Sequence, residues 1–176
     1  MMRVLKDTDT EVVKAMFENF FLNANFIGWQ TQEEMRKKYN CNIPWAILLD
    51  PTSACNLKCT GCWAAEYGNK LNLTFDEIDS IIMQGKELGV YLYIYTGGEP
   101  LVRKKDLIAL CRKHHDCQFL TFTNGTLIDE EFADEMLRPC PMLENPEKLR
   151  EMVAKSGAHS TDLQSPETVE HLCAKC

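Results

Sequence analysis

The sequence lacks three features that would assign a protein to a common class at once. No apolar run approaches the roughly 20 residues of a membrane-spanning helix, and residues 1–10 lack the apolar segment of a secretory signal peptide. Positive charge is scarce, because 19 Lys and Arg stand against 26 Asp and Glu, for a net charge of −7. We therefore expect a cytoplasmic protein that binds neither nucleic acid nor a membrane.

Cysteine, by contrast, is abundant in a chain of otherwise ordinary globular composition. Nine cysteines occur among 176 residues, and an odd number without a secretion signal argues against a disulfide framework. Three of them, Cys55, Cys59 and Cys62, form a C-x₃-C-x₂-C run. Reduced cysteines packed this closely indicate a metal or cluster site.

Apolar patterning predicts three strand–loop–helix units and therefore an α/β fold with a parallel sheet. The continuous run Trp45–Leu49 is typical of a strand buried on both faces. Thr74 opens a helix with Glu77 in capping-box position. The expected strands lie at 45–49, 91–95 and 119–122, and the expected helices at 74–89, 104–115 and 129–137.

The core is expected to lie between two flanking segments. The three regions are an N-terminal helical segment (1–44), a partial core (45–137) and a C-terminal cysteine-containing segment (138–176). Residues 8–27 are predicted to form an amphipathic helix packed on the core, and residues 31–39 a short polar helix or linker. The apolar positions of the 8–27 helix are Val13, Met16, Phe17, Phe20, Phe21, Ala24 and Ile27. Further helices are expected near 146–155 and from Ser165, with no strand after residue 123.

Each predicted strand leads into a loop with distinctive chemistry. The cysteine run follows the first strand, Thr96-Gly-Gly-Glu-Pro100 the second, and Thr123-Asn-Gly125 the third. The carboxyl ends of parallel strands meet at one edge of the sheet, so these loops are predicted to form one site.

Within these loops, glycines 97 and 98 permit close backbone approach. Glu99 can accept from an ammonium group, with a solvated carboxylate as the alternative. Asn124 suits either a turn or a cofactor contact.

Three local thiolates leave the identity of the bound centre open. They would leave one iron of a [4Fe–4S] cubane without a protein ligand, whereas a structural zinc site requires a fourth. Cys140, Cys173 and Cys176 are the candidates for that ligand, or for an auxiliary metal site or a redox pair. The remaining cysteines, Cys41, Cys111 and Cys117, are interpreted as core or incidental.

From about Trp45 to Leu137, the three loops together resemble those of the radical S-adenosylmethionine (SAM) family. The resemblance implies that the cysteine run ligates a [4Fe–4S] cluster and that the Gly97-Gly98-Glu99 loop holds the methionyl amino group of SAM. It also implies reductive cleavage of SAM to a 5′-deoxyadenosyl radical, hydrogen abstraction from a substrate, and a reductant such as flavodoxin or ferredoxin. The implied site residues are Cys55, Cys59, Cys62, Gly97, Gly98, Glu99 and Asn124.

The sequence departs from this pattern at two points. Many family members place an aromatic residue before the third cysteine, against adenine, but here that residue is Gly61, and Trp63 follows Cys62 as either an adenine contact or a core residue. The second departure is length, because the chain has three βα units where the family has about six, so the resemblance implies a partial (β/α) barrel. We interpret the chain as a shortened form, the first half of the core joined to a post-barrel segment like that of members that modify peptides or proteins.

Two alternatives to an enzyme remain at this stage. One is a non-catalytic iron–sulfur or zinc-binding fragment descended from such an enzyme, and the other is a thiol–disulfide protein using the C-terminal cysteine pair. The sheet edge beyond the third strand must be covered by the N-terminal helix, the C-terminal segment or another copy of the chain, as in a homo-oligomer.

Overall fold

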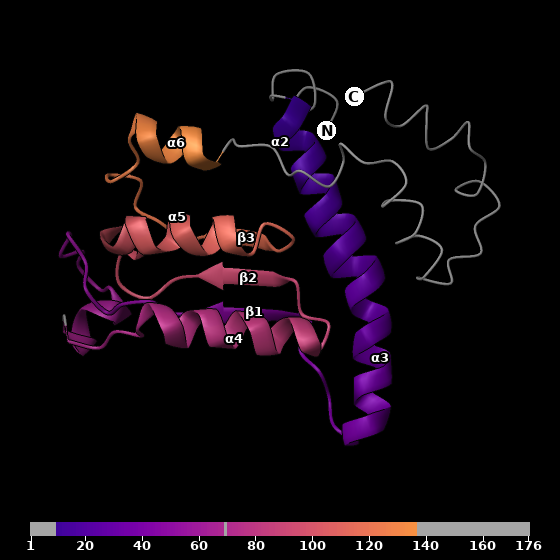
Figure 1. Cartoon of the computed structure of the whole chain (residues 1–176). Coiled ribbons are helices and arrows are strands. Elements are labelled where there is room, and N and C mark those ends of the chain that lie inside the picture. The colour runs from indigo at the N-terminus through magenta and orange to yellow at the C-terminus, as the bar shows by residue number, and fades with distance from the viewer. Residues whose placement is uncertain (1–9, 69, 137–176) are drawn as a thin grey trace.

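The computed structural model describes residues 10–68 and 70–136, and its centre is a parallel three-stranded sheet (Figure 1). The strands are β1 (Ala46–Leu49), β2 (Leu92–Tyr95) and β3 (Gln118–Thr121), in the order β1-β2-β3. Leu49 is in register with Tyr95, and Tyr95 with Thr121, so all three strands end at the same level. The α/β prediction is confirmed, and the three loops begin side by side at the carboxyl edge.

Two helices cover one face of the sheet. They are α4 (Phe75–Glu87) and α5 (Lys104–Lys113), and α6 (Glu130–Met136) follows β3. The predicted capping box begins α4, since the Thr74 side chain accepts from Glu77 N–H at 3.2 Å and the Glu77 carboxylate accepts from Thr74 N–H at 2.7 Å. The main buried cluster comprises Ile43, Leu49, Ile78, Ile82, Val90, Tyr93, Tyr95, Leu101, Leu107, Leu110 and Cys117.

The opposite face of the sheet has exposed apolar side chains. Leu48 is 61% exposed and Leu120 is 48% exposed, whereas their neighbour Leu49 is buried. Side chains alternate between faces along a strand, and α4 and α5 pack only on the face that holds Leu49 and Tyr95. The prediction that β1 is buried on both faces is therefore wrong for the part of the chain that is described.

One long helix crosses the amino ends of the strands (Figure 1). It consists of α2 (Thr10–Met16), the π-helix η1 (Phe17–Ile27) and α3 (Gly28–Tyr39). The two predicted segments at 8–27 and 31–39 are thus one continuous helix. In a π-helix each N–H bonds five residues back, as the Gly28 N–H does to Asn23 O.

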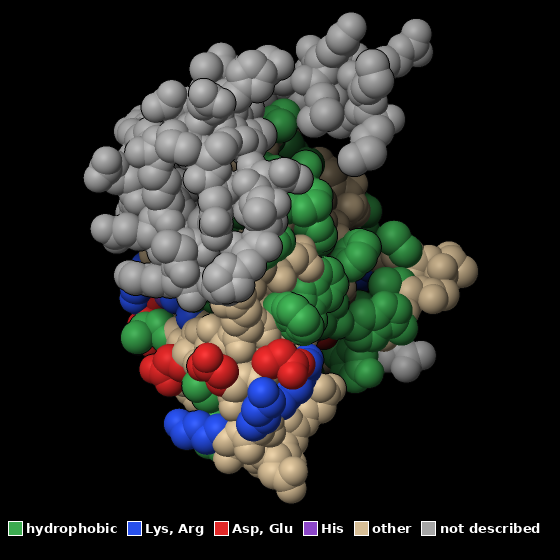
Figure 2. All heavy atoms as spheres, turned by 90° about the vertical axis from the view of Figure 1, so that its right-hand side faces the viewer, with side chains coloured by type: hydrophobic (Ala, Val, Ile, Leu, Met, Phe, Trp, Pro, Cys, Tyr) green, Lys and Arg blue, Asp and Glu red, His purple; other side chains and the backbone are tan. Residues whose placement is uncertain are grey.

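The π winding changes which side of this helix is buried. The buried side carries Glu18, Asn19, Asn23, Ala24, Gly28 and Gln32. Most of the predicted apolar face is partly or fully exposed, including Met16, Phe17 and Phe21 at 42–46%, and Figure 2 shows hydrophobic side chains gathered on the side of the molecule that carries this helix. The predicted buried face is therefore wrong, apart from Ala24.

Polar bonds hold the long helix on the sheet. Asn19 donates to His115 O at 2.9 Å and Cys117 O at 3.0 Å, just before β3. Gln32 donates to Gly89 O at 2.8 Å, just before β2. A Cβ on Gly28 would lie 2.4 Å from Gly89 O, so only glycine allows the helix this close.

His114 is buried at 2% exposure, because α5 packs beside α4, and its Nε2 lies 2.8 Å from Asp79 Oδ1.

Some predictions lie outside the described residues. The helices expected at 146–155 and from Ser165, and residues Cys140, Cys173 and Cys176, fall outside the described residues. Within residues 10–68 and 70–136, no helix combines the length and apolar character that crossing a membrane requires.

Candidate functional site

The loop between β1 and α4 carries Cys55, Cys59 and Cys62 and is called the cysteine loop. At its base, backbone hydrogen bonds continue the pairing of β1 with β2. Beyond the strands, Gly98 N–H donates to Thr52 O at 3.0 Å and Glu99 N–H to Ala54 O at 2.8 Å. A Cβ on Gly98 would lie 2.2 Å from Ala54 O, so a larger residue would push the two loops apart. The glycines of the second loop therefore fix the backbone immediately before Cys55.

The two ends of the cysteine loop are fastened together. Ser53 N–H donates to Leu71 O at 2.8 Å, and Leu73 N–H donates to Pro51 O at 3.1 Å. The guanidinium of Arg103 donates to Pro51 O at 2.8 Å and also to the Leu73 carbonyl. The base is thus held by many bonds, and the cysteines lie in the part that projects beyond it.

All three predicted ligands belong to this projecting part of the loop. Cys59 is exposed, and Cys55 and Cys62 are partly exposed. The Cys55 sulfur accepts from Leu57 N–H at 3.4 Å, and Cys62 N–H donates to Cys59 O at 3.3 Å across a turn in which Gly61 has φ +76°. Across the described residues, no three His, Cys, Asp or Glu side chains are gathered closely enough to hold a metal ion.

Other cysteines are in different surroundings. Cys117 is 2% exposed, and burial raises the pKa of its thiol well above the ordinary range. Burial also raises the pKa of the Cys111 thiol to about 12. Cys117 belongs to the buried cluster, Cys111 is partly exposed in α5, and Cys41 is exposed but precedes β1, whereas the cysteine loop follows β1. Thiolates are the form that binds metals, so the raised pKa values make Cys111 and Cys117 poor candidates for metal ligands.

Glu99 connects the second and third loops. Its side chain is 1% exposed. It accepts from Leu101 N–H at 2.9 Å, from the Thr123 hydroxyl at 2.7 Å and from Asn124 N–H at 2.8 Å. It is therefore not the solvated carboxylate considered as the alternative. Contact of Glu99 with an ammonium group stays a prediction.

Asn124 connects the third loop to the cysteine loop. Its amide donates to Asn56 Oδ1 at 2.9 Å, between Cys55 and Cys59, and its oxygen accepts from Thr126 N–H at 3.0 Å. Both halves of the side chain are used in turn and loop contacts. Its proposed cofactor contact is untested, but the turn chemistry considered beside it is present.

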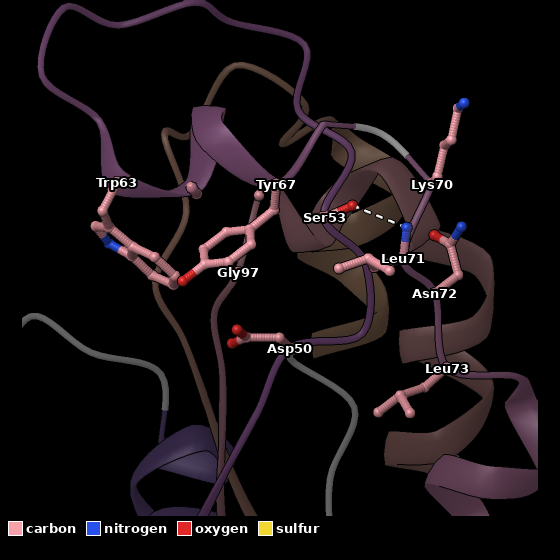
Figure 3. Close-up of a pocket in the computed structure, with 11 residues that line it drawn as sticks. Asp50, Ser53, Trp63, Tyr67, Lys70, Leu71, Asn72, Leu73 and Gly97 are labelled. Atoms are coloured by element: carbon pink, nitrogen blue, oxygen red, sulfur yellow. Dashed lines mark hydrogen bonds between the residues drawn. The ribbon is translucent and has the colours of Figure 1, made fainter.

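A cavity of about 450 Å³ lies beside the cysteine loop. Trp63 and Tyr67 project from the 3₁₀-helix η2 (Trp63–Tyr67) that follows Cys62, and Asp50 lies where β1 ends (Figure 3). Trp63 is 55% exposed, so it is not a core residue. Sequence reasoning missed Asp50 and Tyr67, although a carboxylate at a strand end and an aromatic pair four residues apart were visible signals. The lining is Asp50, Ser53, Trp63, Ala64, Tyr67, Lys70, Leu71, Asn72, Leu73, Gly97 and Gly98.

Comparison with known proteins identifies the family. The profile of the Radical SAM superfamily matches residues 49–144, more than half of the chain, and the chain belongs to this superfamily. It is 33% identical over 96 residues to an Fe-coproporphyrin III synthase of Methanosarcina barkeri, covering 51% of this chain and 23% of that one. It is 30% identical over 107 residues to a GTP 3′,8-cyclase of Clostridium perfringens, covering 57% and 33%.

These similarities cover only part of the related proteins. An uncharacterised protein of Archaeoglobus fulgidus is 30% identical over 111 residues, covering 61% of this chain and 26% of that one. The chain thus spans between about a quarter and a third of the length of these three relatives. No solved structure matches the chain.

Superfamily members typically bind a [4Fe–4S] cluster and SAM, and the donor set of this loop, three free cysteine thiols, has the chemistry that such a cluster requires. Three accessible thiols lie in one loop, and a backbone N–H already points to the Cys55 sulfur, a bond that also tunes iron–sulfur centres. The loop has room to adjust at its turn, because a Cβ on Gly61 would meet no atom within 4 Å.

Proposed function

We propose that Cys55, Cys59 and Cys62 hold a [4Fe–4S] cluster and that SAM binds beside it at the carboxyl edge. The observation that carries this proposal is the attachment of the cysteine loop to the Gly97-Gly98-Glu99 loop by backbone bonds from Gly98 and Glu99. When bound, such a cluster supplies one electron and an open iron for cleavage of SAM to methionine and a 5′-deoxyadenosyl radical, which abstracts hydrogen from a substrate.

The chain's own residues would position these groups. The cysteine thiolates bind iron, and the Gly97-Gly98 backbone borders the cavity in which SAM would lie. Glu99 maintains the spacing of the second and third loops through its bonds to Thr123 and Asn124. The substrate is not assigned, and the family resemblance leads us to expect a peptide.

A second candidate is a cluster-binding or zinc-binding protein without catalysis. It is favoured by the exposed side chains on the uncovered face of the sheet, Leu48, Leu120 and Phe122, of which Phe122 is 68% exposed. A radical must be shielded from solvent, and the described residues do not enclose this face. Activity would then require further chain or a partner on that face.

Anaerobic reconstitution separates the two candidates. The full chain is loaded with iron and sulfide, its iron, sulfide and zinc are measured, and SAM is added with dithionite. The proposed enzyme would hold four irons per chain and release 5′-deoxyadenosine, measured by chromatography. Four irons per chain without release of 5′-deoxyadenosine would favour the non-catalytic candidate. A chain that holds zinc and no iron would overturn the assignment of a [4Fe–4S] cluster.

Matched cysteine variants test the ligand assignment. Cys59→Ala removes a proposed ligand, and Cys41→Ala removes an exposed thiol outside the loop. The first should lose the cluster and the second should retain it. Equal iron in the two variants would contradict the assignment.

A further inference from the structure

The cavity beside the cysteine loop has an aromatic corner that no part of the proposed cluster chemistry uses. Trp63 and Tyr67 lie with ring centroids 5.8 Å apart and ring planes at 77°. They are 55% and 57% exposed, although large aromatic side chains are normally among the most buried. Each ring therefore has open area that a flat ligand can cover.

The geometry limits how such a ligand can bind. The two rings already contact each other edge to face, so a planar ring system can stack on one of them but cannot slide between them. The cavity volume of about 450 Å³ falls within the roughly 300–1,000 Å³ of small-molecule sites. The Asp50 carboxylate extends toward the space below Tyr67 (Figure 3), where it can accept from an amino or hydroxyl group.

The position of the aromatic corner connects it to the proposed SAM site. Trp63 directly follows Cys62, and Gly97 and Gly98 form another part of the same cavity wall. A molecule that reaches from the Gly-Gly loop to the corner therefore lies beside the cysteine loop. Gly61, where an aromatic residue is otherwise expected to contact adenine, has no side chain to do so.

We infer that Trp63 and Tyr67 bind the adenine ring of SAM, in place of the aromatic residue that is missing at position 61. This inference rests on the proposed function, because it assumes that SAM binds at this edge. The base stacks on one ring while the other ring borders its edge, and Asp50 accepts a hydrogen bond from the nucleoside. Stacking of a base on an aromatic side chain is sequence-tolerant and supplies roughly ten-fold in affinity.

Fluorescence offers a test that does not depend on turnover. The chain has three tryptophans, Trp29, Trp45 and Trp63, so Trp29→Phe with Trp45→Phe leaves Trp63 as the reporter in the full chain. Before iron is added, adenosine should quench this signal in a saturable way, while methionine should leave it unchanged. No quenching by adenosine, or equal quenching by methionine, would overturn the inference.

Affinity measurements identify which residues are responsible. SAM binding to the iron-loaded chain is measured by equilibrium dialysis for Trp63→Leu, Trp63→Phe, Tyr67→Leu and the exposed control Trp29→Leu. We expect about ten-fold weaker binding for Trp63→Leu and Tyr67→Leu, a smaller change for Trp63→Phe, and none for Trp29→Leu. Iron content should be equal in all four, because none of them alters a cysteine.

The outcomes separate this inference from the proposed function. If the iron-loaded wild-type chain binds no SAM, the proposed function fails and the adenine assignment falls with it. If the wild-type chain binds SAM and Trp63→Leu and Tyr67→Leu bind it equally well, the adenine assignment alone is overturned.

Discussion

At the amino edge of the sheet, one long helix covers the strand ends and its side chains bond to the backbone there. At the carboxyl edge, three loops bond to one another and leave a cavity beside them. Asn19 and Gln32 of the helix reach the carbonyls before β3 and β2. At the other edge, the bonds run from Gly98 and Glu99 to the loop that carries the cysteines. Both edges depend on glycine for close backbone contact.

This difference between the two edges determines where chemistry can take place in this fold. At the amino edge, the polar side chains of the helix donate hydrogen bonds to backbone carbonyls of the sheet, and the helix covers these carbonyls. At the carboxyl edge, the same kind of bonding holds only the base of each loop, so thiols, aromatic rings and a carboxylate project from a fixed frame. Rigid elements with reactive groups on the connecting loops are the usual arrangement of a site.

The largest expected effect comes from breaking the carboxyl edge. Gly98→Val would place side-chain atoms against Ala54 O, and overpacking of this kind costs about 3 kcal/mol of unfolding free energy. Urea denaturation should show this loss, and iron loading should fail because the cysteine loop is displaced. Gly125→Ala is the control: its φ is +75° but its surroundings are open, so it should cost about 1 kcal/mol and keep iron.

Breaking the amino edge should affect stability without affecting iron. Asn19→Ala leaves the carbonyls of His115 and Cys117 without their side-chain donor, at a cost of about 2 kcal/mol. Asn25→Ala is the matched control, because that exposed amide bonds only within its own helix, to Phe20 O. Denaturation and iron analysis of both variants check this. Lost iron binding in folded Asn19→Ala would contradict the separation of the two edges.

Features of the fold and site that depend on residues close together in the sequence could be predicted, whereas those that depend on distant contacts could not. The α4 capping box and the strands depend on nearby residues, and parallel pairing alone places the three loops at one edge. The buried side of the long helix was not predictable, because its winding brings Asn19 and Asn23 to carbonyls more than 90 residues away. The burial of Glu99 likewise depends on the third loop, which sequence spacing does not reveal.

A third prediction concerns the bond between the second and third loops. Leu101 N–H and the Thr123 hydroxyl donate to one Glu99 oxygen and Asn124 N–H to the other. In Glu99→Gln the orientation that keeps the first two bonds places the amide N–H₂ against Asn124 N–H, which loses its acceptor. We expect a loss of about 1.5 kcal/mol and faster hydrogen exchange at the Asn124 amide. The exposed control Glu130→Gln in α6 should change neither. Unchanged exchange at Asn124 in Glu99→Gln would show that the carboxylate does not hold this loop.

The smallest expected effect is an alkaline loss of stability. The thiol pKa of Cys111 is raised by burial from 9.0 to about 12, and that of Cys117 is also raised. The unfolded thiols release protons near pH 9 while the folded ones keep them, so stability is full below pH 9 and falls as pH rises toward 12. The slope should be on the order of 1 kcal/mol per pH unit for each thiol. Buried Tyr93 and Tyr95, whose pKa values are also raised, add to this loss only above about pH 10.

Urea denaturation at pH 8, 9 and 10 of the wild type and Cys117→Ala checks this prediction. The variant should lose less stability between pH 9 and 10, because one buried thiol has been removed. Equal slopes would show that Cys117 ionises as easily when folded as when unfolded. The exposed Cys41→Ala is the control for the removal of a thiol as such.

The most direct test of the central claim is electron paramagnetic resonance of the reconstituted, reduced chain with and without SAM. We predict a [4Fe–4S] signal that changes when SAM is added, is absent in Cys59→Ala, and persists in Cys41→Ala. A chain that assembles no cluster, or whose cluster signal is the same with and without SAM, would contradict the assignment of the carboxyl edge as a cluster and SAM site.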